Sequence, residues 1–196
     1  MNEREITDLV ALHTSSLPYS IVTALGRTYA RSFYRYVTRS DKEITVVERN
    51  GDGSIVAAAV LSLEPATLNR RLLRHTSLFV HVLVRPRVLV PLMLGGGRIK
   101  KGAAAEAAAS MPEIILLYTR ADERGRGRGT ALIAQVEARL RHLRITAYQV
   151  KTVAEPSNPA LVFYRNRNFI PSGTSAALGR QFHVFIRRLE GDPAAP

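Results

Sequence analysis

Residues 113–130, EIILLYTRADERGRGRGT, decide how the chain folds. Residues 114–118 form an apolar run of strand length, and arginine alternates with glycine from residue 124 onward. Apolar residues then recur at steps of three and four along one helical face: Leu132, Ile133, Val136, Leu140 and Leu143. The sequence therefore predicts a buried strand, a short glycine-rich turn and an amphipathic helix in immediate succession.

A turn of this kind is suited to bind phosphate. The first N–H groups of a helix have no acceptor within the helix, and the helix dipole places partial positive charge there. Glycines let the main chain approach an anion closely, and arginines add positive charge around the same point. An arginine–glycine linker or a nucleic-acid tail is the alternative interpretation. It is disfavoured because an apolar strand and a periodic helix flank the turn.

The turn lacks the Lys-Ser/Thr ending of a P-loop. It resembles the Arg-x-x-Gly-x-Gly turn of the GNAT acetyltransferases, with Arg124, Gly127 and Gly129 at the fixed positions. The resemblance implies that main-chain amides of the turn bind the pyrophosphate of acetyl-CoA or another acyl-CoA. It implies cofactor contacts from the strand end, the turn and the helix start: Tyr118, Thr119, Arg124, Gly125, Arg126, Gly127, Arg128, Gly129 and Thr130.

Residues 158–169, NPALVFYRNRNF, resemble the second motif of the same family. Ala160 and Tyr164 are four residues apart, so they share one face of a short helix. Asn158 is one residue nearer to the tyrosine than the family pattern has it. Asn168 replaces the usual glycine, and asparagine can also adopt the left-handed conformation that ends a helix. The resemblance implies a cofactor contact for Asn158.

The resemblance further implies N-acyl transfer, in which an amine attacks the thioester directly while both substrates are bound. Tyr164 would protonate or hydrogen-bond the departing sulfur, and a main-chain amide near Thr119 would polarise the carbonyl. Glu64 and Glu155 follow predicted strands and are candidates for the base, with Glu64 taken as the catalytic candidate. The five histidines are scattered, so no metal site is predicted.

The chain is predicted to be a single domain, residues 1–196, with an α/β GNAT fold: a central mixed, mostly antiparallel sheet flanked by helices. Helices are expected over 5–14, with Thr7 or Asp8 as start signals, and from Ser20 to Val37. Strands are expected over 43–49, 54–63, 145–153 and 182–189. The family's first strand is expected to be short or absent, because a helix begins so near the N-terminus.

Residues 66–112 are expected to be an insertion between two central strands. Residues 68–73 predict a basic amphipathic helix. The apolar stretch 77–97 is interrupted by Pro86 and Pro91, which disfavours a membrane span and leaves a peripheral membrane contact as the less favoured alternative. A cover over the acceptor site or an oligomer contact, including a homodimer, is the preferred interpretation.

The net charge of +12 comes from 24 Arg and 4 Lys against 16 acidic residues. This excess suits an anionic cofactor and leaves two alternatives to an enzyme: a silent acyl-CoA-binding module, and a basic binder of nucleic acid or anionic membrane. No specific nucleic-acid partner is predicted, and the acceptor is expected to be a small-molecule or protein amine. The absence of Cys excludes a disulfide framework and a thiolate nucleophile. The opening MNEREITDLV lacks a basic-then-apolar signal segment, so a cytoplasmic location is expected.

Overall fold

The computed structural model describes residues 1–74, 111–177 and 179–189. These residues form a six-stranded sheet with the order β1-β2-β3-β4-β6-β5. The strands are β1 (Glu43–Arg49), β2 (Ile55–Ser62), β3 (Glu113–Thr119), β4 (Ala147–Val153), β5 (Ile170–Ala177) and β6 (Arg180–Arg188). Only β3 and β4 pair in parallel, and every other neighbouring pair is antiparallel. The predicted mixed, mostly antiparallel sheet is therefore confirmed.

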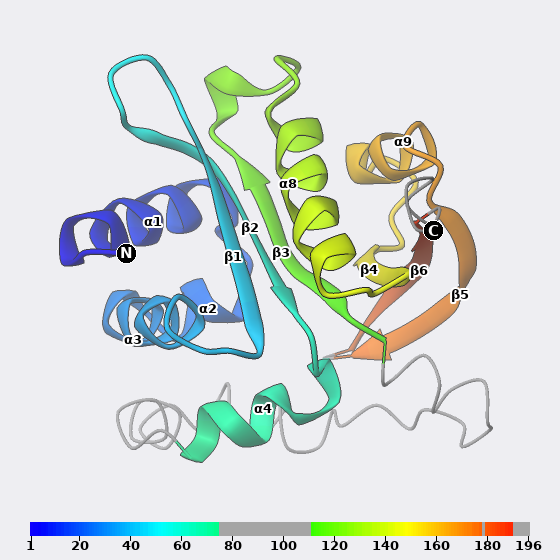
Figure 1. Cartoon of the computed structure of the whole chain (residues 1–196), viewed down its shortest axis with the longest axis horizontal. Helices are drawn as coiled ribbons and strands as arrows, with labels where there is room; N and C mark the ends of the chain where they lie inside the picture. The colour runs from blue at the N-terminus through cyan, green and yellow to red at the C-terminus, as the bar shows by residue number, and fades with distance from the viewer. Residues whose placement is uncertain (75–110, 178, 190–196) are drawn as a thin grey trace.

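Helices cover both faces of the sheet (Figure 1). They are α1 (Glu3–Ser16), α2 (Ile21–Ala24), α3 (Arg27–Val37), α4 (Pro65–Arg74), α8 (Arg128–His142) and α9 (Pro159–Arg165). The helices α1, α2 and α3 lie on one side of β1–β3 and α8 lies on the other, while α4 lies beyond the end of β2. Among the described residues, no helix has the length and apolar character needed to cross a membrane.

Strand β2 occupies the centre of this arrangement, and all of its residues are buried. Ala58 and Val60 pack in the cluster formed with α1 and α3, whereas Ala57, Ala59 and Leu61 pack in the cluster formed with α8. Both faces of β2 are covered by helices, which explains why the strand is apolar almost throughout rather than alternating.

The first helix begins earlier than the predicted start at Thr7 or Asp8. Asn2 Oδ1 accepts a hydrogen bond from Glu5 N at 2.9 Å, and the Glu5 carboxylate accepts one from Asn2 N at 2.8 Å. This capping box satisfies two main-chain donors and starts α1 at Glu3.

The long helix predicted from Ser20 to Val37 is divided in two. Gly26, with φ of +90°, separates α2 from α3, because this conformation cannot continue a right-handed helix. Strand β5 is an element that the sequence does not predict. Its residues are almost all exposed and include Pro171 and Gly173, so they show neither an apolar run nor a clear alternation.

A buried polar chain joins α1, α3 and β3. The Nδ1 atom of His13 lies 2.6 Å from the hydroxyl of Tyr34, and that hydroxyl lies 2.6 Å from the hydroxyl of Tyr118. The Nε2 atom of His13 lies 2.6 Å from Ser20 Oγ. The His13 side chain is fully buried and faces these three uncharged groups.

Which atom donates in each of these hydrogen bonds follows from the group at the end of the series. The Thr23 hydroxyl donates to the Leu17 carbonyl, which can only accept, and the Ser20 hydroxyl donates to Thr23 Oγ1. Nε2 of His13 therefore donates to Ser20. Burial lowers the pKa of His13 to about 4, so the imidazole is neutral at pH 7 and its Nδ1 accepts a hydrogen bond from the Tyr34 hydroxyl.

We predict a pH dependence of stability from this histidine. Between pH 6.5 and about 4 the unfolded chain binds a proton that the folded chain excludes. The free energy of unfolding should therefore fall as the pH drops through this window, by roughly 3 kcal/mol for the full shift. Urea unfolding of the wild type and of His13→Gln at pH 7 and pH 5 measures this contribution.

The His13→Gln variant should show a smaller loss between the two pH values than the wild type. His142→Gln is the matched control, because His142 is exposed at the end of α8. An identical pH dependence in the wild type and His13→Gln would show that the neutral imidazole is not what the fold requires.

Candidate active site

Strands β3 and β4 separate after a short parallel contact. Only two register pairs join them, Glu113 with Gln149 and Ile114 with Val150, although the strands continue to Thr119 and Val153. Beyond these pairs the β4-facing edge of β3 has no strand partner in the described part of the chain. The two strands therefore open a wedge at their carboxyl ends, which is where ligands bind in parallel α/β units.

A β-bulge lies at the point where the wedge begins. Val60 of β2 pairs with Leu116, whereas the next residue, Leu61, pairs with Ile114. Ile115 is therefore an extra residue in β3, and such a bulge bends a strand and increases its twist.

The wedge continues into a cleft of about 490 Å³ between the end of β3, the turn, the start of α8, and α9. Ten of the twelve site residues predicted from the sequence line this cleft: Tyr118, Thr119, Arg124, Gly125, Gly127, Arg128, Gly129, Thr130, Asn158 and Tyr164. The two motifs, nearly 30 residues apart in sequence, thus face one another across a single cavity. Arg126 and Glu64 are not among the lining residues.

The glycines of the turn meet two different requirements. Gly125 and Gly127 have φ of +77° and +79°, in the left-handed region that favours glycine. Gly127 is the N-cap of α8 and provides no side-chain cap, so the first N–H groups of the helix have no capping side chain, and the helix start lines the cleft. At Gly129 a Cβ would lie 3.0 Å from the Phe163 ring, so this glycine lets α9 pack closely on α8.

One buried carboxylate, Glu123, pairs with two of the three arginines of the turn and not with the third. Glu123 is 6% exposed, and it accepts hydrogen bonds from Arg126 at 3.4 Å and Arg128 at 3.0 Å. Arg128 also forms an ion pair with Glu48 at 3.6 Å. Arg124 lines the cleft, and its Nε donates to the Thr119 carbonyl at 3.4 Å rather than to a carboxylate. The positive charge of the turn is thus partly neutralised within the protein.

Asn158 fixes the start of α9 against the end of β4. Its side-chain amide donates to Thr152 Oγ1 and to the Val153 carbonyl, each at 2.8 Å. Its Oδ1 accepts from Ala160 N at 3.0 Å and so caps the helix. Both side-chain N–H groups have acceptors within the protein. Asn158 therefore stabilises the link between β4 and α9 and also lines the cleft.

Tyr164 projects from α9 into the same cleft. The residue is 5% exposed, and its ring packs edge to face against Phe163 and Phe169 at centroid distances of 5.2 Å. Burial raises the pKa of the Tyr164 hydroxyl above its ordinary value, so the group stays protonated and able to donate. The helix ends at Arg165, and Asn168, two residues after the C-cap Asn166, adopts the expected left-handed conformation with φ of +57°.

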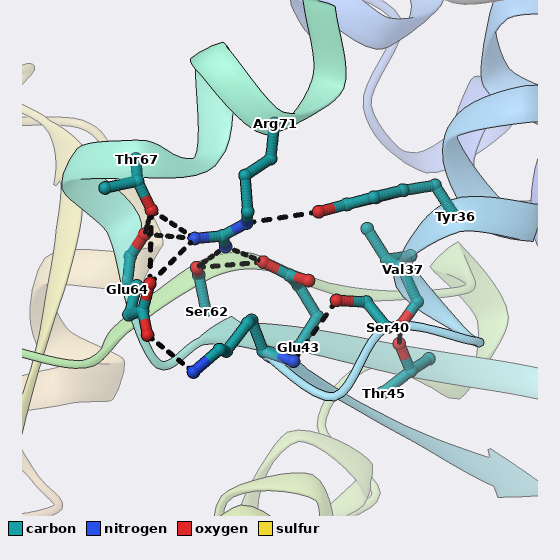
Figure 2. A network of polar contacts seen from close by, with 10 residues as sticks. Tyr36, Val37, Ser40, Glu43, Thr45, Ser62, Glu64, Thr67 and Arg71 are labelled. Atoms are coloured by element: carbon teal, nitrogen blue, oxygen red, sulfur yellow. Dashed lines mark hydrogen bonds and ion pairs between the residues drawn. The ribbon is translucent and has the colours of Figure 1, made fainter. Parts of the chain in front are cut away.

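Glu64 lies at the opposite end of the sheet from the cleft. The register pairs Ala57 with Thr119 and Ser62 with Glu113, so Glu64 follows β2 beside the start of β3, whereas the turn follows its end. Figure 2 shows the Glu64 carboxylate beside Thr67 and Arg71.

Lys42 Nζ lies 2.7 Å from Glu64, and Arg71 lies 3.3 Å from it. The hydrogen bond from Lys42 lowers the pKa of the Glu64 carboxyl, which makes it a weaker base. Glu155, the other candidate, is exposed, pairs with Arg180 at 3.1 Å and does not line the cleft.

Several lining residues were not predicted from the sequence. Ser16 and Leu17 reach the cleft from the end of α1, and Phe163 and Arg167 reach it from α9 and the turn that follows. Arg167 places its guanidinium carbon 3.9 Å from the centroid of the Phe163 ring. Arg167 could have been identified from the sequence, because it lies three residues after Tyr164, at the end of a segment already predicted to face the cofactor.

Comparison with known proteins agrees with this fold. Residues 8–169 match the family model of the acetyltransferase (GNAT) family. No curated protein matches the sequence. Among solved structures, the chain resembles a ribosomal-protein-alanine N-acetyltransferase from Brucella melitensis, with a TM-score of 0.59 and 14% identity over 96% of this chain and 97% of that one.

Two further solved structures have the same fold. Arabidopsis thaliana NAA60, in complex with a bisubstrate analogue, gives a TM-score of 0.60 with 12% identity over 98% of this chain and 97% of that one. A polyamine N-acetyltransferase from Drosophila melanogaster gives 0.58 with 15% identity over 96% and 97%. At these identities the structures support the fold alone. The family model spans most of the chain, and the chain therefore belongs to the GNAT acetyltransferase family.

Proposed function

We propose that this protein is an acyl-CoA-dependent N-acyltransferase that uses acetyl-CoA and transfers the acyl group directly to an amine bound at the same time. One observation carries the proposal: the glycine-rich turn at the uncapped start of α8 and the protonated Tyr164 of α9 line a single cleft. The first feature suits the phosphates of a CoA, and the second suits the reacting end.

The residues around the turn fit the pyrophosphate of a CoA. Gly125 and Gly127 hold the main chain in a left-handed conformation that leaves its amides accessible, and α8 adds the positive end of its dipole. Arg124 supplies positive charge at the cleft wall, with Thr130 on the first turn of the helix. Bound there, an acyl-CoA supplies a thioester, which is an activated acyl group.

The chain's own groups account for two demands of the reaction. The Tyr164 hydroxyl donates a proton or a hydrogen bond where the sulfur leaves. The unpaired edge of β3 beyond Ile114 presents main-chain N–H groups toward the wedge, and one of these polarises the thioester carbonyl. The predicted location near Thr119 is compatible with this edge, which extends from the bulge at Ile115 to the strand end.

The described residues place no carboxylate as a base. Glu123 is the acidic residue of the cleft wall, and three arginines form ion pairs with it: Arg120, Arg126 and Arg128. Glu64 has no part in the proposed mechanism, because it lies at the far end of β2. We infer that the amine gives up its proton to water in the cleft rather than to a side chain of this part of the protein.

The acceptor is proposed to be a primary amine of a small molecule or of a protein. Structural neighbours include enzymes named for both classes, a polyamine acetyltransferase and a ribosomal-protein-alanine acetyltransferase. The discriminating assay is thiol release from acetyl-CoA, with polyamines in one panel and peptides bearing free N-terminal residues in another. Release above the hydrolysis background with one panel is the expected result. Tight binding of acetyl-CoA without release in either panel would instead indicate a silent binding module.

We predict that acetyl-CoA stabilises the fold and that Gly127→Val removes the effect. Ligand at about a hundred times its dissociation constant should add about 2.7 kcal/mol to the free energy of unfolding. A Cβ at Gly127 meets no protein atom within 4 Å, so a valine there would project into the space at the start of α8. Thermal unfolding with and without acetyl-CoA measures the loss.

Gly53→Val is the matched control for this variant. Gly53 has φ of +84° and an equally open surrounding, but it lies in the β1–β2 turn, away from the cleft. Both variants should lose stability without ligand, because a β-branched residue is strained at positive φ. Only Gly127→Val should lose the stabilisation by acetyl-CoA, and an equal response of the two variants would exclude the turn as the pyrophosphate site.

We predict that Tyr164→Phe lowers the turnover number by roughly 10- to 1,000-fold, because one proton donor is lost where the sulfur leaves. The ring and its packing are kept, so acetyl-CoA affinity and the melting temperature should change little. Tyr29→Phe is the control, since Tyr29 is similarly buried in α3 and does not line the cleft. A raised KM with normal turnover would assign Tyr164 to binding, and normal kinetics under chemistry-limited conditions would remove it from the mechanism.

A further inference from the structure

We propose that Arg167 binds the pyrophosphate of acyl-CoA beside the glycine-rich turn, from the α9 side of the cleft. This inference rests on the proposed function and adds a phosphate ligand from outside the turn. The residue follows α9, and no part of the glycine-rich motif contains it.

The guanidinium of Arg167 is held beside the start of α8. Its Nε donates to Thr130 Oγ1 at 3.0 Å, and Nη2 donates to the same oxygen. Its Nη1 donates to the Phe163 carbonyl at 3.0 Å, and the plane stacks over the Phe163 ring. Thr130 is the third residue of α8, so the cation lies at the helix end where the uncapped N–H groups are.

These contacts leave part of the guanidinium available. An arginine has five N–H donors, and the three hydrogen bonds described use one each from Nε, Nη1 and Nη2. One N–H on each terminal nitrogen remains. Two such donors match two oxygens of a phosphate in the bidentate arrangement that guanidinium groups favour.

The charge around Arg167 also favours a bound anion, because the described part of the chain places no carboxylate beside this guanidinium. Arg126 and Arg128 are paired with Glu123, but Arg167 has no carboxylate within 4.0 Å in the described part of the chain. A cation at the N-terminal end of a helix is repelled by the positive end of the dipole. Arg167 and α8 thus present positive charge to the same space, and a pyrophosphate between them would convert this repulsion into attraction.

Isothermal titration of wild type and Arg167→Gln with CoA and with 3′-dephospho-CoA tests the proposal. Both ligands carry the pyrophosphate, so both dissociation constants should rise by roughly 10- to 100-fold, the range for a lost hydrogen bond to a charged group. The ratio between the two ligands should stay unchanged. Arg165→Gln is the matched control, because Arg165 is exposed at the end of α9 and does not line the cleft. This variant should bind both ligands as the wild type does.

Salt dependence separates direct contact from a structural role. The wild-type affinity for CoA should fall more steeply with salt than the affinity of Arg167→Gln, because an ion contact is screened and a packing contact is not. Weaker binding with an unchanged salt slope would mean that Arg167 only positions α9, and it would overturn the proposal.

Three other results would also decide the matter. A loss confined to CoA, with 3′-dephospho-CoA unaffected, would place Arg167 at the 3′-phosphate and refute the pyrophosphate assignment. Wild-type affinity of Arg167→Gln for both ligands would refute any phosphate contact. Failure of the wild type itself to bind either ligand would refute the proposed function, and this inference would fall with it.

Discussion

The structure depends on the early separation of two parallel strands. β3 and β4 share two register pairs and then diverge, so the sheet opens between its third and fourth strands. Breaking a ladder leaves main-chain donors and acceptors without partners, which is costly in a buried setting and acceptable where a ligand or water satisfies them. The bulge at Ile115 and the helix α8 on one side shape this opening, and every feature of the candidate site lies along it.

A phosphate site must keep its positive charge in place before any ligand arrives. Three arginines alternate with glycines beside a helix start that is itself positive, so the empty turn would repel itself. The buried Glu123 offsets this repulsion by accepting from Arg126 and Arg128. The remaining attraction for an anion then comes from main-chain amides, Arg124 and Arg167. Hydrogen bonds within the protein hold both arginine side chains in place before a ligand binds.

Local patterns predicted much of the fold, because strand and helix periodicity is a property of neighbouring residues. The 3.6-residue repeat identified α8, and the Asn-Gly-Asp-Gly run identified the turn between β1 and β2. β5 was missed because an exposed edge strand has no apolar face to reveal it. Glu64 was correctly expected at the end of β2, but the antiparallel register that puts this end far from the cleft is a non-local property.

The arginines show the same limit at the level of chemistry. Arg124, Arg126 and Arg128 alternate with glycine in the same way along the sequence, yet their distances from Glu123 and Glu48 decide which charge remains for a ligand. Glu48 is 80 residues upstream on β1, so no window around the turn includes it. The identity of a side chain is read from the sequence, whereas the availability of its charge is set by the carboxylates that the fold brings beside it. A guanidinium outside the motif can therefore contribute more to anion binding than one within it.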